Sequence, residues 1–270
     1  MDLSKVKLVV SDMDGTLLNA KGEVSQLFFE VFKILQKNKV HFVAASGRQY
    51  NSIVQKLAPI KDYITVIAEN GAIAKQQNKT LLLNKLPSKK LSAIINTLRN
   101  IENAYIVLCS ENTAYIESTN KTFTALFQEY YTAFKTVEDL TKIVSDIDFL
   151  KIAVYHLKSS ETYIYPEVRH LENDFLLKIS GQNWLDISTA KANKGTALQF
   201  VQKQLGVTKE ETLVFGDYHN DLEMLACADF SFAMKNAHSD IKKAANYETD
   251  SHNDFGVEKI LQQVVAAKQK

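Results

Sequence analysis

The chain has 270 residues, of which 46% are hydrophobic, and this is enough to bury one large core or two smaller ones. Its 32 Lys and Arg residues nearly balance 31 Asp and Glu residues, which leaves a net charge of +1. This balance gives no electrostatic reason to expect nucleic acid or an anionic membrane as a partner. The partner that we expect instead is a small polar molecule.

The N-terminal segment and the cysteines bear on the cellular compartment and on the state of the thiols. The apolar run after Lys7 stops at Asp12 and is too short for a signal sequence or a membrane span, so we expect a cytoplasmic protein. Cys109 and Cys227 lie far apart and lack metal-ligand spacing, which indicates packed or idle thiols. For the assembly we expect a monomer or a small homo-oligomer.

The first eighty residues alternate between predicted strands and helices. Residues 8–10 form a short continuous apolar run, typical of a strand buried on both faces of a parallel sheet. A helix capped by Ser25 follows, and strands at 42–45 and 64–67 flank a short helix at 52–57. This alternation predicts a parallel α/β sheet.

The pattern changes in residues 83–186. Separate stretches of helical spacing occur at 91–101 and 123–134, and short alternating strand patterns occur at 105–109, 152–155 and 176–179. Strand and helix patterns then alternate again, at 195–205, 212–215, 222–225, 230–234 and 257–264. We therefore predict an α/β fold with a discontinuous Rossmann-like core, residues 1–82 and 187–270, and an inserted α+β cap, residues 83–186.

Polar side chains follow most of the predicted core strands. They are Asp12 and Asp14 after the first strand, Ser46 and Asn70 after the next two, and Asp217, Asn220 and Asp221 after the strand at 212–215. Ligands of parallel α/β folds bind at the carboxyl ends of strands. Several carboxylates at one edge need a cation to relieve their repulsion. Mg²⁺ suits them best, because it is typically held by a few carboxylates together with substrate phosphate.

The run Asp12-Met13-Asp14-Gly15-Thr16 offers two carboxylates that can divide the work of phosphoryl transfer. Asp12 can attack phosphorus and form an aspartyl-phosphate, while Asp14 protonates the departing alkoxide and then deprotonates the hydrolytic water. Gly15 permits the tight turn between them and frees backbone amides for phosphoryl oxygens. The Asp-x-Asp pair alone is a weak signal, but Gly-Thr at the end of a buried strand makes it specific.

Four separated motifs together resemble the haloacid dehalogenase superfamily, and within it the Cof-type phosphatases of type IIB with a C2 cap. The motifs are Asp12-Met13-Asp14-Gly15-Thr16-Leu17, Ser46-Gly47-Arg48, Lys194-Gly195 and Gly216-Asp217-Tyr218-His219-Asn220-Asp221. Two weaker stretches, 69–72 and 249–257, agree with them. The inserted unit lies between the second and third motifs, where this subfamily carries its cap.

The resemblance implies a role for each matching residue. Asp12 would be the nucleophile and Asp14 the general acid and base. Mg²⁺ would be held by the Asp12 carboxylate, the Asp14 backbone carbonyl and Asp217, with Asp221 supporting it through water. Phosphate would be bound by the second, third and fourth motifs, at Ser46, Gly47, Lys194 and Asn220. Lys194 would also restrain the nucleophile.

Structural alternatives stand beside these roles. Lys194 could be a solvated lysine and Ser46 a helix cap, while Asn70 with Gly71 could serve mainly as a turn. We expect Arg48 to pair with an acidic neighbour or to cap its own turn rather than to contact substrate.

Three residues depart from the family pattern. Tyr218 and His219 stand where small or flexible residues are common, and His252 stands where an asparagine is common. We interpret His219 as a surface residue or as support for the site, not as a catalytic base.

The hypothesis that follows is a Mg²⁺-dependent phosphatase for phosphomonoesters of small metabolites, such as sugar phosphates. The cap would close over the nucleophile and recognise the leaving alcohol. We expect most cap aromatic residues to be core, as aromatic residues in such layers usually are. A phosphosugar mutase and a non-catalytic sensor of phosphorylated metabolites stay open as alternatives.

Overall fold

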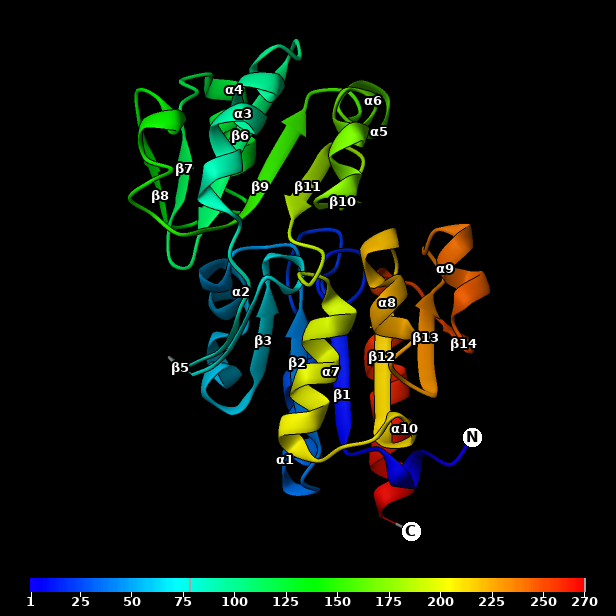
Figure 1. Cartoon of the computed structure of the whole chain (residues 1–270). Helices are drawn as coiled ribbons and strands as arrows, with labels where there is room; N and C mark the ends of the chain where they lie inside the picture. Colours follow the sequence, from blue (N-terminus) through cyan, green and yellow to red (C-terminus); the bar gives the residue numbers. More distant parts are fainter. Residues whose placement is uncertain (78, 270) are drawn as a thin grey trace.

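Two β-sheets organise the chain, and they lie in two units stacked one above the other in Figure 1. The computed structural model describes residues 1–77 and 79–269. The lower unit in Figure 1 carries both labelled chain ends, at the side away from the upper unit. The chain thus leaves the lower unit once and returns to it, as an insertion does.

The core sheet contains eight strands within the described residues, in the order β14-β13-β12-β1-β2-β3-β4-β5. Their bounds are β1 (Leu8–Asp12), β2 (His41–Ala45), β3 (Thr65–Ala68), β4 (Ile73–Gln76), β5 (Lys79–Leu83), β12 (Thr212–Gly216), β13 (Phe230–Met234) and β14 (Tyr247–Thr249). Neighbours from β14 to β3 are parallel, whereas β4 and β5 pair antiparallel. All five residues of β1 are buried, as its central position requires.

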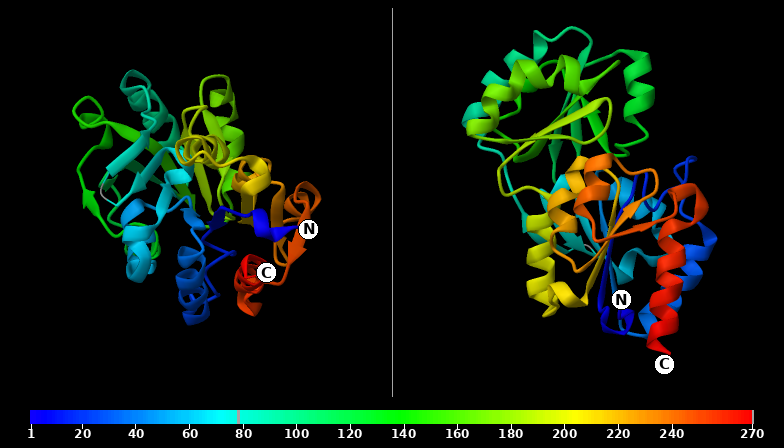
Figure 2. Two further views of the ribbon diagram at one scale, coloured as in Figure 1. Left: turned by 90° about the horizontal axis from the view of Figure 1, so that it is seen from below. Right: turned by 90° about the vertical axis from the view of Figure 1, so that its right-hand side faces the viewer.

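Helices cover both faces of the core sheet. Figure 2 shows α1 (Gln26–Lys37) and α10 (Gly256–Lys268) on one face, and α7 (Lys194–Leu205) with α8 (Leu222–Leu225) on the other. The Ser25 hydroxyl caps α1 by accepting a hydrogen bond from the backbone N–H of Phe28 (3.0 Å). Two shorter helices, α2 (Tyr50–Lys56) and α9 (Ser239–Ala244), complete this unit.

The upper unit, which we call the cap, is built on a second sheet. Within the described residues its six strands follow the order β10-β11-β9-β6-β7-β8, antiparallel except for the β7–β8 pair. Their bounds are β6 (Ala104–Ser110), β7 (Ala114–Ile116), β8 (Phe134–Thr136), β9 (Phe149–His156), β10 (Leu176–Ile179) and β11 (Trp184–Ser188). The helices of the cap are α3 (Ser88–Arg99), α4 (Lys121–Phe127), α5 (Ser160–Tyr163) and α6 (Tyr165–Val168).

The predicted α/β fold with a parallel core sheet and an α+β insertion is confirmed, but the helix predicted at 123–134 is wrong. α4 ends at Phe127, and Phe134 begins β8. The Phe127 ring lies 4.8 Å from the Tyr131 ring and 4.9 Å from the Phe134 ring. These aromatic residues have helical spacing in the sequence, yet they reach one cluster from a helix, a loop and a strand.

Two strands lie close to the predicted boundaries between the core and the cap. β5 ends at Leu83 in the core sheet, and β11 ends at Ser188 in the cap sheet. The division into 1–82 with 187–270 and 83–186 stays our proposal. Both cysteines are buried and unpaired, as expected.

Across residues 1–77 and 79–269, every helix falls short of the length and apolarity that crossing a bilayer requires.

Candidate active site

The carboxyl ends of the parallel core strands face the cap, and a cavity of about 440 Å³ lies between the two units. Its core side is lined by Asp12, Asp14, Gly15, Ser46, Gly47, Arg48, Asp217, Tyr218 and Asn220. Its cap side includes Tyr130, Tyr155 and Trp184. Six of the eight site residues predicted from the sequence therefore line one cavity, and the other two, Lys194 and Asp221, lie beneath it.

A buried lysine and three aspartates form the floor of this cavity. The Lys194 ammonium lies 2.5 Å from Asp12 Oδ1 and 2.7 Å from Asp221 Oδ1, and its side chain has no exposed surface. One oxygen from each of Asp12, Asp217 and Asp221 lies within 4.8 Å of the others. The alternative of a solvated Lys194 is therefore wrong.

Local backbone geometry brings these groups together. Gly15 has φ +74°, and a Cβ there would lie 2.3 Å from Asp217 Oδ2, so the turn after Asp12 needs glycine. A Cβ on Gly195 would lie 2.6 Å from the backbone of Glu223. Gly195 thus lets α7 approach α8 closely, which carries Lys194 toward Asp221.

Asp221 also orders the loop that carries Asp217. Its Oδ2 accepts hydrogen bonds from the backbone N–H groups of Asp217 (2.9 Å) and Tyr218 (3.2 Å). Its Oδ1 holds Lys194. Asp221 is fully buried, and its part in metal binding stays a prediction.

The floor holds three carboxyl groups and one ammonium group. Burial raises the pKa of Asp12 to about 7, with Lys194 opposing the shift and Asp221 adding to it. Burial, followed by the charge of Asp12, raises the pKa of Asp217 to about 9. Burial disfavours the charged form of Lys194, but Asp12 and Asp221 outweigh it and raise its pKa. The raised pKa values show that the charged carboxylates lack enough positive partners, and a hard divalent cation such as Mg²⁺ fits such a cluster of oxygens.

Arg48 connects the predicted proton donor to the cap. Its guanidinium binds both carboxylate oxygens of Asp14 at 2.6 Å, which confirms the expected pairing with an acidic neighbour. It also donates to the backbone carbonyl of Glu129 and lies 4.6 Å from the centre of the Tyr130 ring. The Ser46 hydroxyl accepts the backbone N–H of Arg48 (3.1 Å).

A second buried lysine, which the sequence analysis missed, joins the cap to the core. The Lys151 ammonium on β9 lies 2.8 Å from Glu69 Oε2 and 3.3 Å from Asp186 Oδ1, and it donates to the Gly47 carbonyl at 2.9 Å. The sequence does contain a pattern that indicates this cluster, because Lys151 and Asp186 each stand between apolar residues of a buried strand. A charged residue in that position is buried only with partners.

Asn70 extends this cluster to the fourth motif. It has φ +52°, so the interpretation as a turn is confirmed, but its amide also acts as a bridge. Its Nδ2 donates to Asp186, and its Oδ1 accepts a hydrogen bond from Asn220 Nδ2 (2.9 Å). Asp186, Asn70 and Asn220 therefore form a chain of hydrogen bonds that runs from the cap to the wall of the cavity.

Removing the Lys194 charge will destabilise the protein strongly. Lys194→Met leaves Asp12 and Asp221 buried without their cation, and we expect a loss of about 3–5 kcal/mol in the free energy of unfolding. Urea unfolding of the purified protein measures it. Lys203→Met, an exposed position on the same helix, is the control and should change stability by under about 0.5 kcal/mol. Equal stability of the two variants would contradict the ion-pair assignment.

Lys151→Met will destabilise the protein by a similar mechanism, again by about 3–5 kcal/mol, because Glu69 and Asp186 then face each other without a cation. Adding Glu69→Gln removes one of the two buried carboxylates and should recover part of the loss. Denaturant unfolding of the single and double variants measures the coupling, with the exposed Lys158→Met as the control. Strictly additive losses would show that the two residues act independently.

Known proteins resemble this chain over nearly its whole length. The profile of the haloacid dehalogenase-like hydrolases matches residues 9–261. The 5-amino-6-(5-phospho-D-ribitylamino)uracil phosphatase YbjI of Escherichia coli is 27% identical over 263 residues, 96% of this chain and 96% of its own. The Bacillus subtilis phosphatase YcsE, named for the same substrate, is 27% identical over 259 residues, 95% of this chain and 94% of its own. A crystal structure from Streptococcus mutans superposes with a TM-score of 0.88 at 28% identity, covering 97% of this chain and 99% of that one.

Proposed function

Because this chain belongs to the haloacid dehalogenase-like hydrolases, in their Cof-type branch, we propose that it is a Mg²⁺-dependent phosphatase that forms an aspartyl-phosphate on Asp12. The substrates are phosphomonoesters of small metabolites. The observation that supports this most directly is the cavity floor, where Asp12 is paired with Lys194 and lies close to two further aspartates. The phosphatase names of the two curated relatives point the same way.

The metal would be held by the carboxylates of Asp12 and Asp217 and by the backbone carbonyl of Asp14, with Asp221 supporting it. Mg²⁺ bound there supplies positive charge that neutralises the phosphoryl group and the crowded carboxylates. Lys194 supplies a second positive charge from below.

The reaction then uses the residues of the first motif. Lys194 holds Oδ1 of Asp12, which leaves the other carboxylate oxygen to attack phosphorus as the bond to the leaving alkoxide breaks. Asp14 gives its proton to that alkoxide. A water molecule then attacks the aspartyl-phosphate while Asp14 takes its proton, and phosphate leaves with Asp12 restored. Hydrogen-bond donors on Ser46, Asn220 and the backbone at Gly47 orient the phosphoryl oxygens.

Arg48 sets a condition for this proton transfer. Both Asp14 oxygens are bonded to its guanidinium, so Asp14 has to release at least one of them to receive and deliver a proton. Because Arg48 also binds the Glu129 carbonyl, the position of the cap bears on this exchange.

The cap side of the cavity supports a leaving group that contains a flat ring. The Trp184 ring meets Tyr155 and Tyr130 edge to face, with centroids 4.9 Å and 5.5 Å apart. Trp184 Nε1 is buried and lacks a hydrogen-bond partner among the described residues. Such an aromatic wall with a spare donor suits a ring that bears a carbonyl oxygen. The two relatives are named for a substrate with a uracil ring on a phosphoribityl chain, and we propose a ring-bearing polyol phosphate for this chain.

Release of inorganic phosphate from an aryl phosphate tests the central proposal. We expect turnover that requires Mg²⁺, stops with EDTA and falls by at least about 10³-fold in Asp12→Asn. Asp62→Asn, at an exposed position, should keep full activity. Activity that persists in Asp12→Asn would show that another group is the nucleophile.

The same assay separates the alternatives when sugar phosphates are supplied. An isomerised sugar phosphate without free phosphate would favour the mutase, and tight binding without turnover would favour the sensor.

Trp184→Phe tests the ring-binding wall. This variant keeps an aromatic ring and removes the N–H, so we expect the KM for a ring-bearing ribityl phosphate to rise about tenfold while kcat changes little. Steady-state kinetics with that substrate and with a plain sugar phosphate measures the difference. A plain sugar phosphate should be nearly unaffected, and equal losses for both substrates would contradict the assignment.

A further inference from the structure

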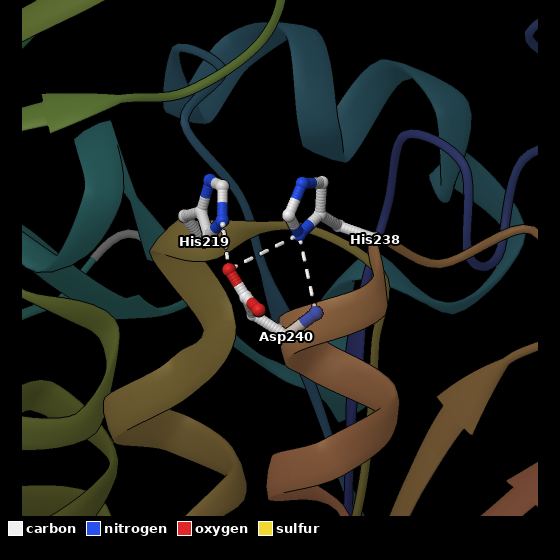
Figure 3. A group of neighbouring side chains, drawn as sticks. All are labelled: His219, His238 and Asp240. Carbon is white, nitrogen blue, oxygen red and sulfur yellow. Dashed lines mark hydrogen bonds and ion pairs between the residues drawn. The ribbon is translucent and has the colours of Figure 1, made fainter.

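A cluster of two histidines and one aspartate lies outside the cavity and has no part in the proposed reaction. His219 belongs to the fourth motif, and His238 and Asp240 stand at the start of α9. Figure 3 shows both imidazole rings above the Asp240 carboxylate. The rings lie 4.2 Å apart, and the three side chains are between one third and one half exposed.

The spacing of the three groups fits tetrahedral metal coordination. Asp240 Oδ2 lies 3.4 Å from His219 Nε2 and 3.5 Å from His238 Nδ1. With metal–ligand bonds of about 2.0–2.1 Å, ligand atoms of a tetrahedral site lie about 3.3 Å apart. One ligand atom from each residue falls within 4.8 Å of the others, so an ion could be held with small adjustments.

Hydrogen bonds account for part of this arrangement, since His219 Nε2 lies within hydrogen-bond distance of Asp240 Oδ2 (3.4 Å) and His238 caps the first turn of α9. His238 Nδ1 accepts a hydrogen bond from the backbone N–H of Asp240 (3.2 Å), so this nitrogen presents a lone pair and no proton. It nevertheless faces Asp240 Oδ2, which is also an acceptor. Two acceptors at that distance repel each other, and a cation that took the Nδ1 lone pair from the Asp240 N–H would turn the repulsion into coordination.

The donor atoms select the class of ion. Two imidazole nitrogens and one carboxylate oxygen suit borderline ions such as Zn²⁺, Ni²⁺ and Co²⁺, whereas Mg²⁺ prefers oxygen alone. The cavity floor offers only carboxylate oxygens from its three aspartates. The two groups therefore differ in the metal that each prefers. Lys243, which lies 3.4 Å from Asp240 Oδ1, contacts the oxygen that faces away from the histidines.

The cluster is bonded to the loop that carries Asp217. The backbone N–H of His238 donates to the Asp217 carbonyl (2.9 Å), and His219 follows Asp217 by two residues. Tyr218 of this loop lines the cavity, and the centre of its ring lies 5.0 Å from that of the His219 ring and 6.0 Å from that of the His238 ring. An ion on the cluster would hold α9 to the loop of the fourth motif.

We propose that His219, His238 and Asp240 form a binding site for a borderline divalent transition-metal ion, separate from the acidic floor of the cavity. The site goes beyond the phosphatase assignment and does not depend on it.

Calorimetric titration of Zn²⁺ into the full-length, tag-free protein tests the proposal, with Mg²⁺ at saturation so that the acidic floor is filled. We expect one Zn²⁺ per chain. His238→Ala and Asp240→Asn should each weaken binding at least about tenfold, since each removes one of three ligands. His170→Ala, an exposed histidine of the cap, is the matched control and should bind as the unaltered chain does.

Two further measurements make the outcome decisive. Asp12→Asn should retain Zn²⁺ binding, and its loss would show that the ion occupies the acidic floor and would overturn the proposal. Zn²⁺ should raise the melting temperature of the unaltered chain but not of His238→Ala or Asp240→Asn. The proposal is also overturned if the unaltered chain binds no Zn²⁺, or if these two variants bind it with the original affinity.

Discussion

The buried ion pair between Lys194 and two aspartates is the interaction on which the rest of the site depends. Lys194 and Asp12 are 182 residues apart in the sequence, and their contact joins the two halves of the split core at the end of β1. Burying one ammonium with several carboxylates costs desolvation energy that only close pairing returns. This desolvation cost arises at the site where the ion pair orients Asp12, since the ammonium fixes one carboxylate oxygen and leaves the other free.

The cap is attached to the core by the same principle. Lys151 of β9 is as buried as Lys194 and lies between Glu69 of the core and Asp186 of the cap. Glu69, Asn70 and Gly71 are three consecutive residues with positive φ, a backbone conformation that ordinary residues avoid. Their partners hold them there, and the result is that Asn70 can bridge Asp186 to Asn220.

The features that could be predicted from the sequence are those that depend on a pattern of neighbouring residues. An apolar run that ends on acidic residues predicted β1 and the position of Asp12, because strand burial and strand ends are visible within a few residues. The partners of Lys151 could not be predicted in this way, since Glu69 and Asp186 are distant in the chain and their pairing depends on how cap and core meet. The helix predicted at 123–134 failed because aromatic spacing alone does not distinguish one helical face from a cluster assembled by several elements.

Two residues of one short segment join the proposed phosphate site to the cap. Gly47 gives its carbonyl to Lys151, and the next residue, Arg48, binds Asp14 and the Glu129 carbonyl. The second motif thus contacts the cap at two points while it lies beside the proposed phosphate site. A shift of the cap that breaks the Arg48 contact to Glu129 would also change the surroundings of the Asp14 carboxylate. In the proposed mechanism, substrate fit at the aromatic wall and the release of Asp14 by Arg48 would therefore be coupled through the same three-residue turn, although the residues proposed to react all belong to the core.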